Sequence, residues 1–132
     1  ATWYITGVQL EKSSVATPFE YRQYTNELQL CERYYEKSYN MSVVPGTVDT
    51  GGCWSFYVNT GSAGGYGCSW KTRKRTAPTV TVYSPSTGAS GKYNGAGTDY
   101  TVSVGNTGET GAFIYGGSTT NNYWHATLSA EL

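Results

Sequence analysis

Tyrosines and asparagines beside glycine-rich segments are the side chains best placed to bind a ligand in this sequence. They are Tyr66, Tyr93, Asn94, Asn121, Asn122 and Tyr123. A tyrosine ring offers a flat apolar face and a hydroxyl, and an asparagine amide can both donate and accept hydrogen bonds. Sugar rings present C–H faces and hydroxyls, and adaptable Ser/Gly/Asn loops with tyrosine are typical of contact surfaces. We therefore expect these six residues to form a glycan-binding surface.

Groups for catalysis are scarce. The C-terminal part of the chain offers Asp99, Glu109 and Glu131, with Asp49 just before it, and none lies in a motif that singles it out. Glycoside hydrolysis normally needs two carboxylates at a set separation. His125 is the only histidine, and no nucleophile elbow lies near it in the sequence. We therefore expect a binding protein, not an enzyme, with no cofactor.

Metal binding is not expected either. His125 should be an ordinary solvent-facing strand residue, although three copies of it could meet at the axis of a trimer and hold a metal ion. The cysteines Cys31, Cys53 and Cys68 form no CxxC motif and no metal-spaced cluster with the histidine. We interpret them as reduced thiols, two of them in the cores of strands.

The one run of charge is basic and contains Lys71, Arg73, Lys74 and Arg75. It favours a solvated edge strand, where cationic side chains discourage pairing with another chain. Contact with acidic sugars or phosphates of lipopolysaccharide is a second interpretation. Nucleic acid is disfavoured because the 132-residue chain has a formal net charge of +0. No apolar run approaches the length of a membrane span, so we expect no membrane insertion.

From Gly51 onward the sequence pattern is that of β-strands. The strands are expected at Cys53–Asn59, Gly67–Arg75, Thr79–Ser84, Asp99–Gly105, Gly111–Tyr115 and Tyr123–Glu131. In the last strand Trp124, Ala126, Leu128 and Ala130 alternate with Tyr123, His125, Thr127 and Ser129, which predicts one buried and one wet face. Trp54, Trp70, Tyr115 and Trp124 are expected in the core.

Three long glycine-rich segments separate these strands, at Thr60–Tyr66, Pro85–Thr98 and Gly116–Asn122. If the strands alternate in direction, all three loops lie at one end and the short turns lie at the other. The clustering fails if Arg75 to Thr79 is one continuous bulged strand, since Pro78 is tolerated at a sheet edge.

The first fifty residues have a different pattern. Residues 26–37 predict a helix, with Asn26 as its cap and Leu28, Cys31 and Tyr35 along one stripe. Such a short helix is marginal alone, so either the β-domain or helices of other chains must cover the stripe. We divide the chain into a strand and linker from a preceding domain (1–22), a helical neck (23–50) and a β-domain (51–132).

Residues 5–35 contain the stretches ITGVQLE at Ile5–Glu11, ATPFEYR at Ala16–Arg22 and ELQLCERYY at Glu27–Tyr35, and a later stretch reads APTVTVYSPSTG at Ala77–Gly88. These stretches resemble segments that recur in bacteriophage tail fibre and tail structural proteins. The resemblance implies a C-terminal, receptor-binding domain of a tail fibre or tailspike. It also implies a homotrimer whose helices join near the symmetry axis, and the beginning at Ala1 would then fall inside the last strand of a preceding β-sandwich.

Residues and resemblance together predict a mostly β protein, an antiparallel β-sandwich tip preceded by one short helix and assembled as a homotrimer. It would form the distal tip of a phage tail fibre in the virion, made in the host cytoplasm. Its partner would be a bacterial surface polysaccharide or lipopolysaccharide, bound for host attachment. The alternatives are a trimerisation cap that binds nothing and a monomeric carbohydrate-binding module.

Overall fold

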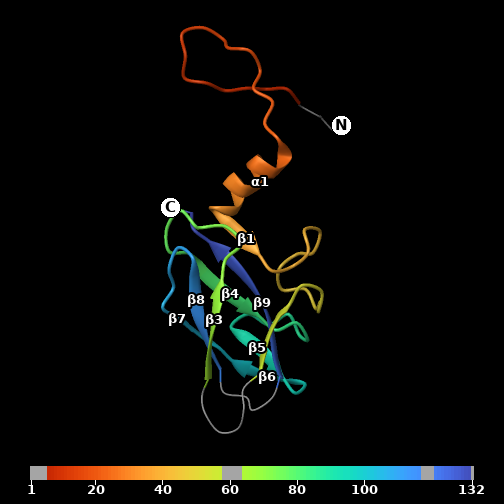
Figure 1. The fold of residues 1–132 in the computed structure, drawn as a ribbon. Helices are drawn as coiled ribbons and strands as arrows, with labels where there is room; N and C mark the ends of the chain where they lie inside the picture. Colours follow the sequence, from red (N-terminus) through yellow and green to blue (C-terminus); the bar gives the residue numbers. More distant parts are fainter. Residues whose placement is uncertain (1–5, 58–63, 117–120, 132) are drawn as a thin grey trace.

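The computed structural model describes residues 6–57, 64–116 and 121–131. The described chain has two parts, an N-terminal arm that leads into a helix and a body of β-strands below them (Figure 1). Every pairing between the described strands is antiparallel. The prediction of a mostly β chain with one short helix and antiparallel sheets is confirmed.

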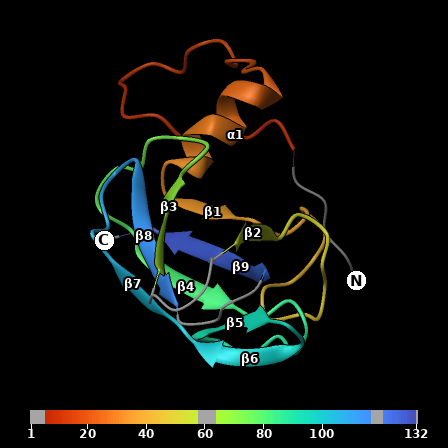
Figure 2. The same ribbon diagram turned by 60° about the horizontal axis from the view of Figure 1, so that its bottom comes forward.

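A six-stranded sheet is built around one long central strand, β9 (Asn121–Ser129). β1 (Tyr35–Lys37) and β2 (Trp54–Tyr57) lie along one side of it, and β4 (Thr79–Tyr83) and β5 (Lys92–Gly95) lie along the other, as Figure 2 shows. β6 (Thr98–Thr101) extends the sheet by pairing with β5. β9 therefore holds together segments that are far apart in the sequence.

A second, three-stranded sheet has β8 (Gly111–Gly116) at its centre, with β3 (Gly64–Ser69) and β7 (Ser103–Gly105) on either side. One cluster of buried side chains contains residues of both sheets, among them Ile114 of β8 and Trp124 of β9, each 0% exposed. Trp54 packs edge-on against Trp124 at 4.5 Å between ring centroids. The two sheets thus share a single hydrophobic core.

The predicted alternation in the last strand is confirmed on its apolar face, where Trp124, Ala126 and Leu128 are 0% exposed. The prediction that His125 faces solvent is wrong, because this side chain is also 0% exposed. Its ring stacks on Tyr39 at 3.8 Å between centroids, so the segment after β1 covers this part of the outer face. Alternation shows which residues share a face but not what covers it.

Three predicted β-domain elements differ in the structure. The strand predicted at Asp99–Gly105 is two strands, β6 and β7, and the chain passes from one sheet to the other at Val102. The segment Pro85–Thr98, predicted to be a loop, contains β5. The strand predicted at Gly67–Arg75 ends at Ser69, and the basic residues that follow it are not in a strand.

The helix α1 spans Tyr24–Glu32, two residues earlier than predicted at its start and five residues shorter at its end. Gln23 is the residue at its N-cap, not Asn26, and no side chain caps it. The chain enters β1 three residues after Glu32, and Glu36, within the predicted helix range, is instead a strand residue that is 3% exposed. Pairing with β9 ends the helix, which shows tertiary structure overriding a weak local propensity.

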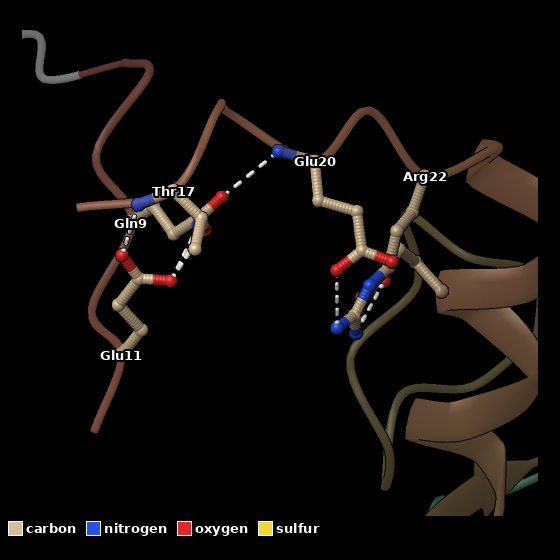
Figure 3. A network of polar contacts seen from close by, with 6 residues as sticks. Gln9, Glu11, Thr17, Glu20 and Arg22 are labelled. Atoms are coloured by element: carbon tan, nitrogen blue, oxygen red, sulfur yellow. Dashed lines mark hydrogen bonds and ion pairs between the residues drawn. The ribbon is translucent and has the colours of Figure 1, made fainter. Parts of the chain in front are cut away.

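The described part of the predicted N-terminal strand, residues 6–10, is not a strand, and Ala1 to Ile5 lie outside the described residues. Polar contacts fold this arm back on itself, as Figure 3 shows. Glu11 accepts hydrogen bonds from the Thr17 backbone N–H and hydroxyl, both at 2.6 Å, and Gln9 accepts one from the Glu20 N–H at 2.9 Å. Arg22 forms ion pairs with Glu20 and Glu27. No apolar core forms here.

Across the described stretches, no helix combines the length and the hydropathy that crossing a bilayer requires.

A candidate binding surface at the distal end

The end of the β-body farthest from α1 is where β2 ends and β9 begins, and we call it the distal end (Figure 1). Residues 60–63 and 117–120, which belong to two of the predicted loops, lie outside the described residues, as do residues 58–59 of a predicted strand. The predicted clustering of long loops therefore stays a prediction. Three of the six predicted binding residues are exposed: Tyr66, Asn121 and Tyr123. The exposed fraction is 43% for Tyr66 and 39% for Tyr123. The other three are buried.

The buried three are packed in the chain itself. Tyr93 is 0% exposed and stacks on Tyr100 at 5.6 Å between centroids, because β5 is a strand with this side chain on its core face. Asn94 is 7% exposed and accepts a hydrogen bond from the Gly97 N–H, which closes the turn between β5 and β6. Asn122 is 0% exposed, on the core side of β9 opposite Phe56.

The outer face of the large sheet carries an exposed group of side chains at this end. Tyr57 of β2 lies directly opposite Asn121 of β9, and Ser55 lies opposite Tyr123. Residues that face each other across an antiparallel pair are on the same side of the sheet, with Cβ atoms about 5 Å apart. Tyr57 is 68% exposed. Tyr57 is not among the six residues predicted from the sequence, although its alternation with Phe56 within a predicted strand is a signal that could have found it.

Tyr66, on β3 of the second sheet, also lies at the distal end. Its ring stacks on Phe56 at 5.5 Å between centroids and 10° between planes. Ser55, Tyr66 and Ser69 are among the residues that line a groove of about 440 Å³ between β2 and β3. Ser55 thus belongs both to this groove and to the exposed outer face. We call Ser55, Tyr57, Tyr66, Asn121 and Tyr123 the distal patch.

His125 lies in a hydrogen-bond chain that fixes its tautomer. Nε2 is 3.0 Å from the Asp49 carbonyl oxygen, which can only accept, so Nε2 carries the proton. Nδ1 then accepts a hydrogen bond from the Ser38 hydroxyl at 2.8 Å, and the Ala126 N–H donates to the same hydroxyl oxygen. Burial lowers the pKa of His125 and outweighs the opposing effects of Asp49. The Ser38–His125 pair is buried and joins the segment after β1 to the sheet.

Asp99 has a similar structural role beside the turn between β5 and β6. Its carboxylate accepts hydrogen bonds from Ser84 at 2.6 Å, from Asn94 at 3.2 Å and from Thr87. Burial by itself would raise the pKa of Asp99, but these three hydrogen bonds together lower it. A carboxylate so engaged stabilises the turns on which the distal end is built and is poorly suited to abstract a proton.

The basic run is not the solvated edge strand that the sequence predicted. Lys74 is 1% exposed, its ammonium lies 2.5 Å from a Glu36 carboxylate oxygen, and it donates to the Glu32 carbonyl oxygen at 2.6 Å. Arg73 pairs with Glu109, and the Arg75 guanidinium lies 5.7 Å from the centroid of the Tyr34 ring. The contacts of Lys74 and Arg75 join the helix end and β1 to the body, whereas the Arg73 ion pair lies within the body.

Tyr115 is not the core residue that the sequence predicted. It is 40% exposed on the outer face of the small sheet, and its ring stacks on that of Phe113, which is 43% exposed. Trp54, Trp70 and Trp124 do belong to the core or pack against it, as predicted.

The three cysteines are free, and Cys68 is buried while Cys31 is exposed. Burial raises the pKa of the Cys68 and Cys53 thiols, so neither is activated as a nucleophile. Within the described ranges no three histidine, cysteine or acidic side chains gather closely enough to hold a metal ion.

Comparisons with protein-family models, with curated proteins and with solved structures gave no significant match. The distal end offers a ligand exposed tyrosine rings, a serine hydroxyl and an asparagine amide.

Proposed function

We propose that this protein is the distal tip of a bacteriophage tail fibre and binds a bacterial cell-surface glycan through the distal patch. The observation that carries the proposal is the position of the patch. Its exposed tyrosines lie at the end of the β-body opposite the arm and α1. If the arm and helix connect to the rest of a fibre, as the resemblance at Ile5–Tyr35 implies, the patch is the part that meets the host.

The chemistry of the patch suits a sugar. Tyr57 and Tyr123 are diagonal neighbours on the same outer face, because Tyr57 lies opposite Asn121 and Tyr123 is two residues further along β9. Their rings can stack on C–H faces, while their hydroxyls, with Ser55 and Asn121, can bond to sugar hydroxyls. The patch contains no charged side chain, so binding would rest on stacking and neutral hydrogen bonds.

Assembly as a homotrimer is part of the proposal. No residue of α1 is buried in the single chain, and Leu30 is 44% exposed. A groove of about 630 Å³ beside the helix is lined by Leu28, Tyr35 and Trp54 together with polar and charged side chains, among them Glu32 and Lys71. Helices of neighbouring chains packed there would bury this surface. Three patches per tip would raise avidity without new contacts.

The two sheets share one core, which supports a β-sandwich as the architecture of the tip. A trimerisation cap that binds nothing would not need exposed tyrosines at the end far from the helix. A monomeric carbohydrate-binding module would leave the apolar helix surface uncovered. The fibre-tip proposal accounts for both surfaces.

The proposal is tested by incubating the fluorescently labelled protein with a panel of bacterial strains and with their purified surface polysaccharides. We expect selective binding to some strains and to the polysaccharide of those strains. A Tyr57→Ala/Tyr123→Ala variant should lose this binding by at least about tenfold, because stacking on each exposed ring contributes on the order of 1 kcal/mol.

The matched control is Tyr21→Ala, which removes a tyrosine that is 91% exposed on the arm, outside α1 and at the end of the protein opposite the patch. It should bind like the unaltered protein. Circular dichroism establishes that each variant is folded, and light scattering gives the number of chains. Binding by none of the proteins across the panel would favour the trimerisation cap, and a monomer would favour the isolated module.

A further inference from the structure

The outer face of the small sheet carries a flat aromatic surface formed by Phe113 and Tyr115. The two rings belong to alternate residues of β8, and their centroids lie 6.0 Å apart with 25° between planes. Each is about two-fifths exposed. They lie on a different sheet from Tyr57 and Tyr123.

The neighbours of these rings keep the surface flat. The cross-strand partners of Tyr115 are Gly65 and Ser103, and those of Phe113 are Gly67 and Gly105. A Cβ on Gly65 would lie 2.9 Å from two carbon atoms on one edge of the Tyr115 ring, and a Cβ on Gly105 would lie 2.9 Å from a carbon on the other edge. The ring of Tyr115 therefore occupies the space that side chains on both flanking strands would need.

Polar groups lie next to the rings. The Asn106 amide donates to the Tyr115 hydroxyl oxygen at 3.1 Å, so the proton of that hydroxyl remains available to an acceptor. A shallow hollow of about 420 Å³ adjoins Phe113 and is lined by Ser69, Asn106 and Thr110 among others. None of the residues lining the hollow, and none of the cross-strand partners of the rings, is charged.

We propose that Phe113 and Tyr115 form a second glycan subsite, which takes neutral pyranose units of the same surface polysaccharide. The proposal rests on the proposed function and extends it to a separate face. Two rings in near-parallel planes can stack on successive sugar units, and the adjoining hydroxyl and amide groups can bond to ring hydroxyls. The absence of charge around the rings favours neutral sugars over acidic ones.

A protein partner fits this face less well. A stable protein interface needs roughly 800 Å² from each side and well-packed side chains at its centre. Here the strands beside the rings contribute three glycines and a serine, which leaves little side-chain surface to bury. A sugar chain needs only the flat rings and the polar groups beside them.

The test uses the whole protein labelled with ¹³C in its aromatic side chains and titrated with neutral oligosaccharides released from the surface polysaccharides of the panel strains. We expect the resonances of Phe113 and Tyr115 to shift together with those of Tyr57 and Tyr123. A Phe113→Ala/Tyr115→Ala variant should keep the shifts at Tyr57 and Tyr123 and bind the intact polysaccharide at least about tenfold more weakly. Phe113→Tyr preserves a stacking ring and should bind like the unaltered protein.

The outcomes separate the two proposals. Shifts at Tyr57 and Tyr123 alone, with full binding by the double variant, would overturn the second subsite and leave the distal patch standing. Shifts at Phe113 and Tyr115 alone would uphold the subsite and overturn the distal patch. Shifts at neither would overturn both. A folded double variant that becomes monomeric in light scattering would assign the rings to a contact between copies of the chain.

Discussion

Two regions of the molecule are stabilised by different interactions: the N-terminal arm together with α1, and the β-body. From residue 6 to Cys31 the chain has no buried residue, and its side-chain contacts are hydrogen bonds, ion pairs and one edge-on ring contact between Phe19 and Tyr21. The body buries Trp124, Leu128 and Ile114 completely. Exposed ion pairs contribute about 0–1 kcal/mol each, whereas a fully buried large apolar side chain contributes about 1.5–3 kcal/mol. The body therefore has its own source of stability, and the arm depends on something beyond itself.

The junction between the two regions is itself polar and buried. Lys74 lies between the Glu36 carboxylate and the Glu32 carbonyl at the C-terminal end of α1, where a cation is favoured by the helix dipole. Thr72 adds a hydrogen bond to the Glu32 carboxylate at 2.9 Å. The direction in which the helix leaves the body thus depends on a few charge-assisted contacts.

The largest effect is expected from breaking this junction. Lys74→Met leaves the Glu36 carboxylate buried and unpaired, which should lower the free energy of unfolding by about 3–5 kcal/mol. Urea denaturation followed by tryptophan fluorescence measures the change. A Glu36→Leu/Lys74→Met variant removes both charges and should recover much of the loss. If the single variant is as stable as the unaltered protein, the pair does not secure the junction.

A Leu→Ala substitution in each region compares how much a leucine side chain contributes to the free energy of unfolding there. Leu128→Ala should lower the free energy of unfolding by about 2–5 kcal/mol, because it opens a cavity in the shared core. Leu30→Ala, at a position 44% exposed, should stay within about 0.5 kcal/mol when measured on dissociated chains. Urea denaturation at low protein concentration measures the free energy of unfolding of both variants. At high concentration, a clear loss for Leu30→Ala would mean that other chains cover α1.

The smallest effect concerns pH and is confined to the body. Because the pKa of His125 is lowered in the folded protein, the unfolded chain takes up the proton first as pH falls through about 6.5. The free energy of unfolding should therefore keep the full contribution of neutral His125 above pH 6.5 and decline as the pH falls below it. Asp99 has an ordinary pKa of 3.8 that folding lowers, so its contribution is lost only in more acidic solution.

Denaturation midpoints at pH 7.5, 6.5 and 5.5 measure this decline. Since the chain has one histidine, a His125→Gln variant should show a flat profile over the same range, whatever its absolute stability. Stability that rises on acidification would contradict the buried neutral imidazole.

The alternation of apolar and polar residues in the sequence was enough to predict several strands of the body and one of its core faces. The alternation around Trp124, Ala126 and Leu128 placed them correctly in the core, and the strands at Thr79–Tyr83 and Gly111–Gly116 were predicted within one residue at each end. Alternation is a property of the strand backbone, which sends successive side chains to opposite faces wherever the strand lies. A core face made of large apolar residues is therefore visible in the sequence.

What covers each face was decided only by the tertiary structure. Tyr93 is surrounded by glycines in the sequence and is buried because β5 pairs with both β6 and β9, while His125 is buried because Tyr39 stacks on it. Tyr115 is exposed because glycines on both flanking strands leave its ring uncovered. Burial of a tyrosine or a histidine depends on partners distant in the sequence, and a local pattern carries no information about them.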